Sequence, residues 1–195
     1  MSSLLEEYHP ASALHQTAAV NGDAPQPSPI PSFQLRRSMP SGGEVELLIQ
    51  TFDDRILVII TQNGKVGCLT QAALPAVVPL PQPPRSAPTS SLSHFPPPPP
   101  SITLTSLLGS PPNRALHETY VAHIATLIWW TLQEVKEARR PVVVGLSLER
   151  KRRGVEGQSG VEDDGEEGSL ELDEVERERF EGVLGMVAEW AGPKG

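Results

Sequence analysis

The 195-residue sequence has little of what marks secreted, membrane-spanning or nucleic-acid-binding proteins. Its one cysteine, Cys68, rules out an intramolecular disulfide, and no Asn-x-Ser/Thr site occurs; both are typical of a reducing compartment. No stretch approaches the ~18 apolar residues of a membrane helix, and the first 20 residues lack the apolar segment of a signal peptide. Acidic residues outnumber basic ones 24 to 16, which argues against nucleic acid as a partner. We therefore predict a cytoplasmic protein with neither nucleic-acid nor membrane partners.

Motifs that carry catalysis are also missing. The sequence has no phosphate-binding glycine loop, no Gly-x-Ser-x-Gly and no Cys-x-x-Cys. His117 and His123 lie six apart, which places them ~120° apart around a helix, so they are not expected to share a metal ion. Cys68 lies in a predicted strand, where a free cysteine usually packs as a small apolar residue. We predict no enzyme activity, no cofactor and no metal site.

Proline is abundant instead, with 21 residues in clusters. We predict a disordered tail over residues 1–31 and a single domain over 32–192, interrupted by a proline-rich insertion at 75–100 and a charged loop at 150–168. Phe95-Pro-Pro-Pro-Pro99 resembles a ligand of EVH1-type domains, but a low-complexity linker is the favoured interpretation. The basic cluster at 150–153 fits a nuclear-import signal or a solvated loop equally well, so nuclear localisation stays open.

The central stretch of the domain runs from Glu44 to Thr70. Ile56–Ile60 is an unbroken aliphatic run, too short for a helix and without the alternation of a strand that has one wet face. Asn63-Gly64 follows, which predicts a two-residue hairpin turn leading into a returning strand at 65–70. The hairpin motif comprises Gln62, Gly64, Lys65 and Gly67.

The rest of the domain predicts further strands at 33–39, 44–52, 102–108 and 142–148. Two helices are predicted: one begins at Ser110 or Asn113 and ends at Arg139-Arg140, and the other spans 170–190. The fold class is α+β, with an antiparallel sheet of five to six strands and two main helices on one face.

The other sheet face has no helix left to cover it. An exposed apolar sheet face is not expected on a soluble monomer, so we predict that it packs against a partner subunit. The residues predicted to form this dimer interface are Ile56, Val58, Ile60, Val142 and Val144.

The segment Ile56-Leu-Val-Ile-Ile-Thr-Gln-Asn-Gly-Lys-Val-Gly67 resembles the central hairpin of the proteasome assembly chaperone 3 family. The order that follows is also similar: a strand ending Leu107-Leu108-Gly109, a long helix, the strand at 142–148 and a terminal helix closing on Trp190. The resemblance implies a non-enzymatic chaperone that promotes assembly of the α-subunit ring of the 20S proteasome. It also implies a dimer, formed with the related assembly chaperone 4 or with a second copy, and contacts with proteasome α-type subunits.

Two other interpretations remain open at this point. A longin- or roadblock-like scaffold for trafficking or GTPase complexes would also be a dimeric sheet-and-helix module. A cysteine- or histidine-dependent hydrolase would require an accessible Cys68 thiol of lowered pKa.

Overall fold

The computed structural model describes residues 30–40, 42–62, 64–82, 95–149 and 174–193. They form six strands and two helices: β1 (Ser32–Ser38), β2 (Glu44–Thr51), β3 (Ile56–Thr61), β4 (Cys68–Ala73), β5 (Thr103–Leu108), α1 (Arg114–Glu134), β6 (Val142–Ser147) and α2 (Glu174–Ala188). The predicted tail up to residue 29, the basic cluster and the charged loop lie outside the described residues.

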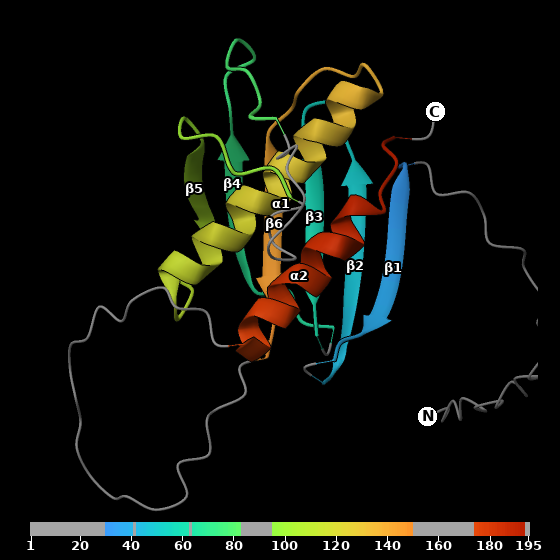
Figure 1. Ribbon diagram of the computed structural model, residues 1–195, viewed down its shortest axis with the longest axis vertical. Helices are drawn as coiled ribbons and strands as arrows, with labels where there is room; N and C mark the ends of the chain where they lie inside the picture. Colours follow the sequence, from blue (N-terminus) through green and yellow to red (C-terminus); the bar gives the residue numbers. More distant parts are fainter. Residues whose placement is uncertain (1–29, 41, 63, 83–94, 150–173, 194–195) are drawn as a thin grey trace, which may run out of the picture.

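The strands form one sheet in the order β1-β2-β3-β6-β4-β5, and both helices lie on the same face of it (Figure 1). All neighbouring pairs are antiparallel except β3 and β6, which run parallel. The predicted α+β class, with six strands and two helices on one face, is confirmed. The sheet is mixed because β6 returns along β3 after α1 has crossed the sheet.

The predicted hairpin after β3 is wrong. β3 and β4 do not pair, because β6 lies between them and pairs with both. Gln62 continues the β3–β6 ladder, with its amide donating to the Ser147 carbonyl at 2.9 Å. Its side-chain Oε1 accepts from the Glu149 amide at 2.7 Å. The chain after Gln62 is therefore a crossover to a strand on the far side of β6.

The remaining motif residues belong to this crossover. Gly64 has φ +65°, the left-handed conformation that glycine adopts without strain, and Lys65 is exposed. Gly67 lies directly against β6: a Cβ atom there would be 1.8 Å from the Leu146 carbonyl oxygen. Glycine is needed at 67 for this close backbone approach.

Helix α1 begins directly after Asn113, the second of the two N-caps that the sequence predicts. The Asn113 side chain accepts from the Leu116 amide at 3.0 Å, as an N-cap does. The helix ends at Glu134 rather than at the predicted Arg139-Arg140, because Lys136 turns into the left-handed region with φ 61°. The segment 135–141 then leads into β6.

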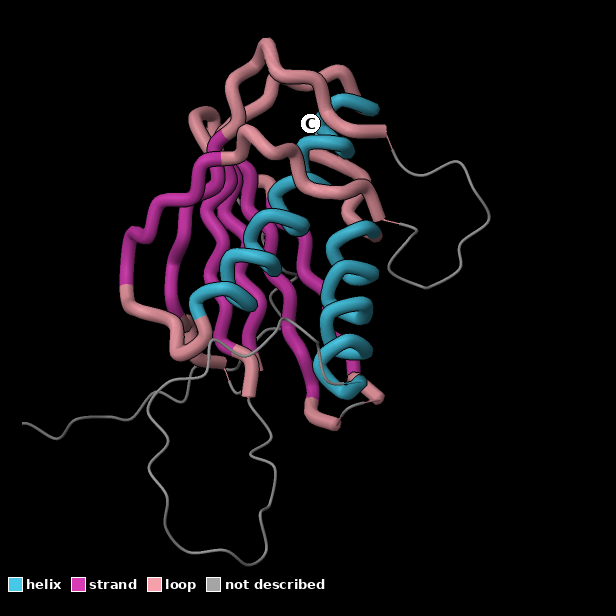
Figure 2. Tube along the Cα trace, turned by 60° about the vertical axis from the view of Figure 1, so that its left-hand side comes forward, coloured by secondary structure: helices cyan, strands magenta, loops and turns pink. Residues whose placement is uncertain are grey.

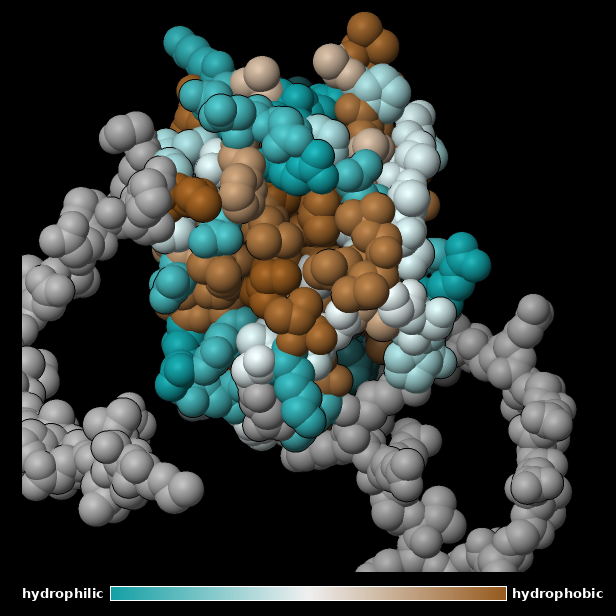
Figure 3. Space-filling model, turned by 180° about the vertical axis from the view of Figure 1, so that it is seen from behind, coloured by the Kyte–Doolittle hydropathy of each residue, from teal (hydrophilic) through white to brown (hydrophobic). Residues whose placement is uncertain are grey.

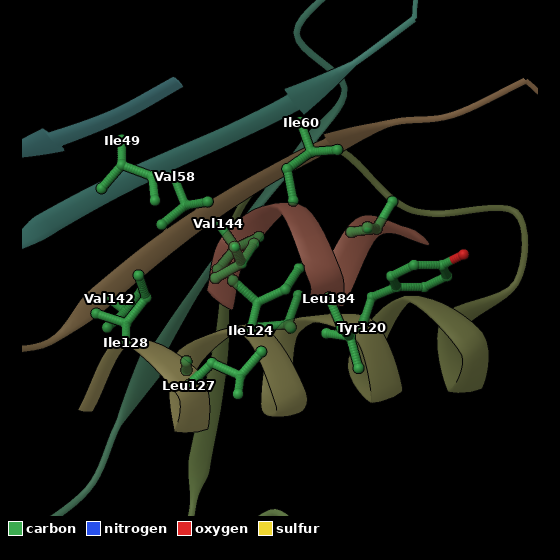
Figure 4. Packing of buried hydrophobic residues seen from close by; sticks show 14 of the residues in the cluster. Ile49, Val58, Ile60, Tyr120, Ile124, Leu127, Ile128, Val142, Val144 and Leu184 are labelled. Carbon is green, nitrogen blue, oxygen red and sulfur yellow. The ribbon is translucent and has the colours of Figure 1, made fainter. Parts of the chain in front are cut away.

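The core lies between the sheet and the two helices. Figure 4 shows side chains of β2, β3 and β6 pointing toward those of α1 and α2. The helices are joined by Tyr120, whose hydroxyl donates to Glu176 Oε1 at 2.7 Å and whose ring meets Phe180 edge-on at 4.8 Å between centroids. Burial raises the pKa of the Tyr120 hydroxyl, so it is a donor at neutral pH.

Candidate partner-binding face

The five residues predicted for a dimer interface do not face outward. Ile56, Val58, Ile60, Val142 and Val144 are each at most 1% exposed and belong to the core cluster beneath the helices. The prediction of these residues is therefore wrong. In an uninterrupted aliphatic run, odd and even positions are equally apolar. The sequence therefore could not tell which alternate residues point toward the helices. Their neighbours along β3 and β6 point the other way.

The strand register gathers apolar side chains across the opposite face. Cross-strand partners share a face, and the sequence of partners Leu48, Ile59, Gly145, Leu69 and Leu108 runs in one row through β2, β3, β6, β4 and β5. In a second row, Leu57 lies beside Val143, and Gln50 of β2 and Gln71 of β4 flank this pair. We call this surface the open face, defined by Leu48, Leu57, Ile59, Val66, Leu69, Leu108 and Val143.

Figure 3 shows the open face as a continuous hydrophobic area in the middle of the sheet. In the part of the chain that the structure describes, both helices lie on the other side of the sheet and leave this area uncovered. Val66 is 59% exposed and Leu108 60% exposed, whereas Val143 in the middle of the face is only 6% exposed. The other four residues of the open face are half-buried. Apolar surface gathered in one such patch is typical of a contact with another protein.

Gly145 leaves room for apolar side chains at the centre of the open face. A Cβ atom at this position would lie 2.7 Å from Ile59 Cδ1 and 2.8 Å from Leu69 Cδ2. The side chains of the two flanking strands thus occupy the space next to the glycine, and a larger residue there would displace them.

The open face has a charged border on one side. Arg36 of β1 contacts the carboxylates of Glu44 and Glu46 on β2, and Thr61 continues this polar row onto β3. A shallow groove of about 420 Å³ runs between this border and the apolar residues Leu48 and Ile59. An apolar centre with a polar rim is the usual anatomy of a protein interface.

The polar residues that could carry chemistry have structural roles instead. His117 Nε2 lies 3.0 Å from Thr70 Oγ1, a hydrogen bond that ties α1 to β4, and burial lowers the pKa of His117. His123 Nδ1 is 2.9 Å from the Thr119 carbonyl oxygen, and its ring packs on Phe180. Cys68 is half-buried on the helix side of β4, opposite Leu146.

The described residues also offer neither a metal site nor a membrane-spanning helix. Within the described ranges, no group of three or more His, Cys, Asp or Glu side chains is placed to hold a metal ion. Among the helices described, none combines the length and apolar character needed to cross a membrane. The open face therefore remains the feature of the described surface that most needs a functional explanation.

No family model matches the chain, and no curated protein matches its sequence. Among solved structures, it is similar to a chain in a crystal structure described as a novel chaperone complex for yeast 20S proteasome assembly. The two share 12% identity and superpose with a TM-score of 0.37, over 58% of this chain and 77% of the other. A likeness at that level transfers no function.

Proposed function

We propose that this protein is a non-enzymatic dimeric module that works through its open face. The observation that carries the proposal is the apolar row across five strands, which the described helices leave uncovered. Burying apolar area contributes ~25 cal/mol per Å², so a face of this kind favours association with a second sheet. Packing sheet against sheet places the helices of both subunits on the outside.

Within this class, we propose an assembly chaperone for the α-subunit ring of the 20S proteasome. The support is the resemblance of the Ile56–Gly67 segment and of the element order after it to the proteasome assembly chaperone 3 family. The partner on the open face is then a related chaperone 4 subunit or a second copy of this chain, and α-type proteasome subunits bind the dimer. The proposed place of action is the cytoplasm, and a nuclear role stays open as it does from the sequence.

The test is an affinity purification from native lysate with the full chain, using two variants as controls. Ile59→Asp places a charge in the apolar row, and Val175→Asp makes the same kind of change at an exposed valine of α2 on the opposite side. We expect the parent and Val175→Asp to recover a small chaperone subunit together with α-type subunits and without the mature particle. We expect Ile59→Asp to lose them while keeping the parent's circular dichroism spectrum.

Recovery of small GTPases or trafficking proteins, with no proteasome subunits, would replace the chaperone proposal by the longin- or roadblock-like scaffold. If Ile59→Asp recovers the same proteins as the parent, the open face is not the binding surface.

A further inference from the structure

The proline-rich insertion is packed against the domain at both of its described ends. Residues 75–82 follow β4 and residues 95–100 precede β5, and the loop segments gather at the end of the sheet next to the C-terminal end of α1 (Figure 2). Leu80 is only 8% exposed and belongs to the core cluster, and Val78 and Phe95 pack against that cluster. These ends are therefore part of the fold and not a free linker.

The first end is held through its backbone carbonyl groups. The Trp130 indole Nε1 donates to the Pro81 carbonyl at 3.1 Å. Arg139 Nη1 donates to the carbonyls of Pro75 at 2.8 Å and Val78 at 2.9 Å. All three acceptors lie in residues 75–82, and both donors come from α1 or the loop that follows it.

This arrangement uses the chemistry by which proline-rich peptides are recognised. The segment begins with a turn at 75–78, which the Val78 amide closes on the Pro75 carbonyl at 3.1 Å. Pro79 and Pro81 lack a backbone N–H, so the rest of the segment has few backbone donors and its carbonyl groups stay available to outside donors. Domains that bind such peptides offer an aromatic-lined groove, and an indole N–H is a donor only, well suited to a proline carbonyl. Trp130 supplies both the ring and the donor; it packs against the same core cluster to which Leu80 belongs.

We propose that the C-terminal half of α1 and the loop after it form a recognition site for proline-rich peptides that present free carbonyl groups, filled in cis by residues 75–82. The occupant is this chain's own segment, and a free peptide of the same chemistry competes with it for Trp130 and Arg139. The site lies on the helix side of the molecule, away from the open face. It therefore does not depend on the proposed chaperone function.

The Phe-Pro-Pro-Pro-Pro motif at 95–99 is a poorer candidate for the ligand of an outside domain. Phe95 packs against the core, and Pro96 and Pro99 are buried. An EVH1-type domain could not grip the motif while it lies in this position. Binding of such a domain to the folded parent protein would show that residues 95–99 leave the core. That result would count against stable packing of the ends of the proline-rich insertion on the domain.

The test weakens the cis segment and leaves the site intact. Leu80→Asp in the full chain puts a charge at a buried position of the segment, whereas Trp130 and Arg139 are unchanged. The probe is a blocked synthetic peptide of residues 74–82, with a scrambled peptide of the same composition as control. Binding is followed in every variant by the fluorescence anisotropy of a dye attached to the peptide. The indole N–H resonance of Trp130, identified by comparison with Trp130→Phe, shows whether the peptide binds at this site.

We expect saturable binding of the native-sequence peptide to Leu80→Asp, and weaker binding to the parent, whose site is filled. Adding Trp130→Phe to Leu80→Asp removes one hydrogen bond and should weaken binding roughly three- to tenfold. The proposal is overturned if a folded Leu80→Asp chain binds neither peptide at millimolar concentration, or binds both equally.

A second measurement on the unaltered chain covers the case in which Leu80→Asp does not fold. The Val78 amide donates to the Pro75 carbonyl at 3.1 Å within the segment, whereas Val144 lies in the central strand β6. An exchangeable segment opens locally, so the Val78 amide should exchange with solvent hydrogen much faster than the Val144 amide. Equal rates with equal denaturant dependence would mean that residues 75–82 open only with the whole fold, and that result would also overturn the proposal.

Discussion

At the scale of single residues, Gly67 and Gly64 show two different structural needs for glycine: close approach to another backbone and a left-handed φ angle. Gly67→Ala brings a Cβ atom to 1.8 Å from a backbone carbonyl oxygen of β6, so the crossover must move. Gly64 has nothing within 4 Å of such an atom but has φ +65°. We expect Gly67→Ala to lower the free energy of unfolding by more than about 2 kcal/mol, and Gly64→Ala by about 1 kcal/mol.

Urea denaturation of both variants beside the parent measures the difference. Equal small losses would show that the crossover does not pass over the end of β6 as described, since a hairpin between β3 and β4 would leave room for alanine at 67.

Single residues of β2 and β3 also show how far the sequence could predict which side chains form the open face. Val45, Leu47 and Ile49 alternate along β2 with polar or half-buried residues, a pattern that predicts one common face, and that face is the buried one. Ile56–Ile60 has no such alternation, since β3 is a central strand with apolar neighbours on both sides. The need for cover on both faces of β3 could therefore be predicted, but the side on which Leu57 and Ile59 lie could not.

At the scale of elements, the start of α1 gives a matched pair of variants. Asn113 caps the helix through its side chain, whereas Ser110, the other predicted cap, lies a turn earlier and is exposed. We expect Asn113→Ala to cost about 1 kcal/mol of unfolding free energy and Ser110→Ala to stay within about 0.5 kcal/mol. Thermal or urea unfolding of the two variants checks this, and the reverse order would place the helix start at Ser110.

The same helix makes stability depend on pH. Burial lowers the pKa of His117 and of His123 below the ordinary value of 6.5. The unfolded chain therefore takes up protons at a higher pH than the folded chain does. The stability contributed by the two neutral rings is fully present above about pH 6.5 and is lost as the pH falls from there toward their folded pKa values.

Urea unfolding between about pH 5 and 8 tests this effect. The parent should lose stability as the pH falls below about 6.5, and His117→Gln and His123→Gln should each flatten part of that loss. A parent whose stability is unchanged over this range would mean that both rings can be protonated in the folded state without cost.

Strand order is the property of the elements that the sequence could not supply. An apolar run locates β3, the sequence predicts a strand at 142–148 where β6 lies, and the turn signal places the next strand at 65–70, three residues before the observed β4. Pairing, however, is decided by packing over the whole sheet. β6 follows β4 by 68 residues in the chain and still lies between β3 and β4, because the crossover through α1 places a parallel neighbour beside β3. A local turn signal such as Asn63-Gly64 carries no information about that distant strand.

At the scale of the whole molecule, the two sheet faces have different roles. One face is buried by α1 and α2, with Ile56, Val58 and Val144 at 0% exposure. The open face is also apolar in its central strands, at Leu57, Ile59 and Val143, but any cover for it must come from outside the described elements. If that cover is a partner subunit, the stability of the fold and association are linked, because a partner that binds only the folded chain stabilises it.

This linkage makes the melting temperature depend on protein concentration. For a chain that dimerises with itself through the open face, each tenfold rise in concentration adds about 1.4 kcal/mol to the free energy that holds the dimer. We expect the parent's melting temperature to rise steadily between about 1 and 100 μM, and that of Val175→Asp to rise equally. Ile59→Asp should melt at a temperature independent of concentration, because a charge in the apolar row cannot be buried against a second copy.

A parent melting temperature that does not change with protein concentration would exclude the second copy as the occupant of the open face. In that case the occupant is a different subunit. Adding this purified subunit should then raise the melting temperature of the parent and leave that of Ile59→Asp unchanged.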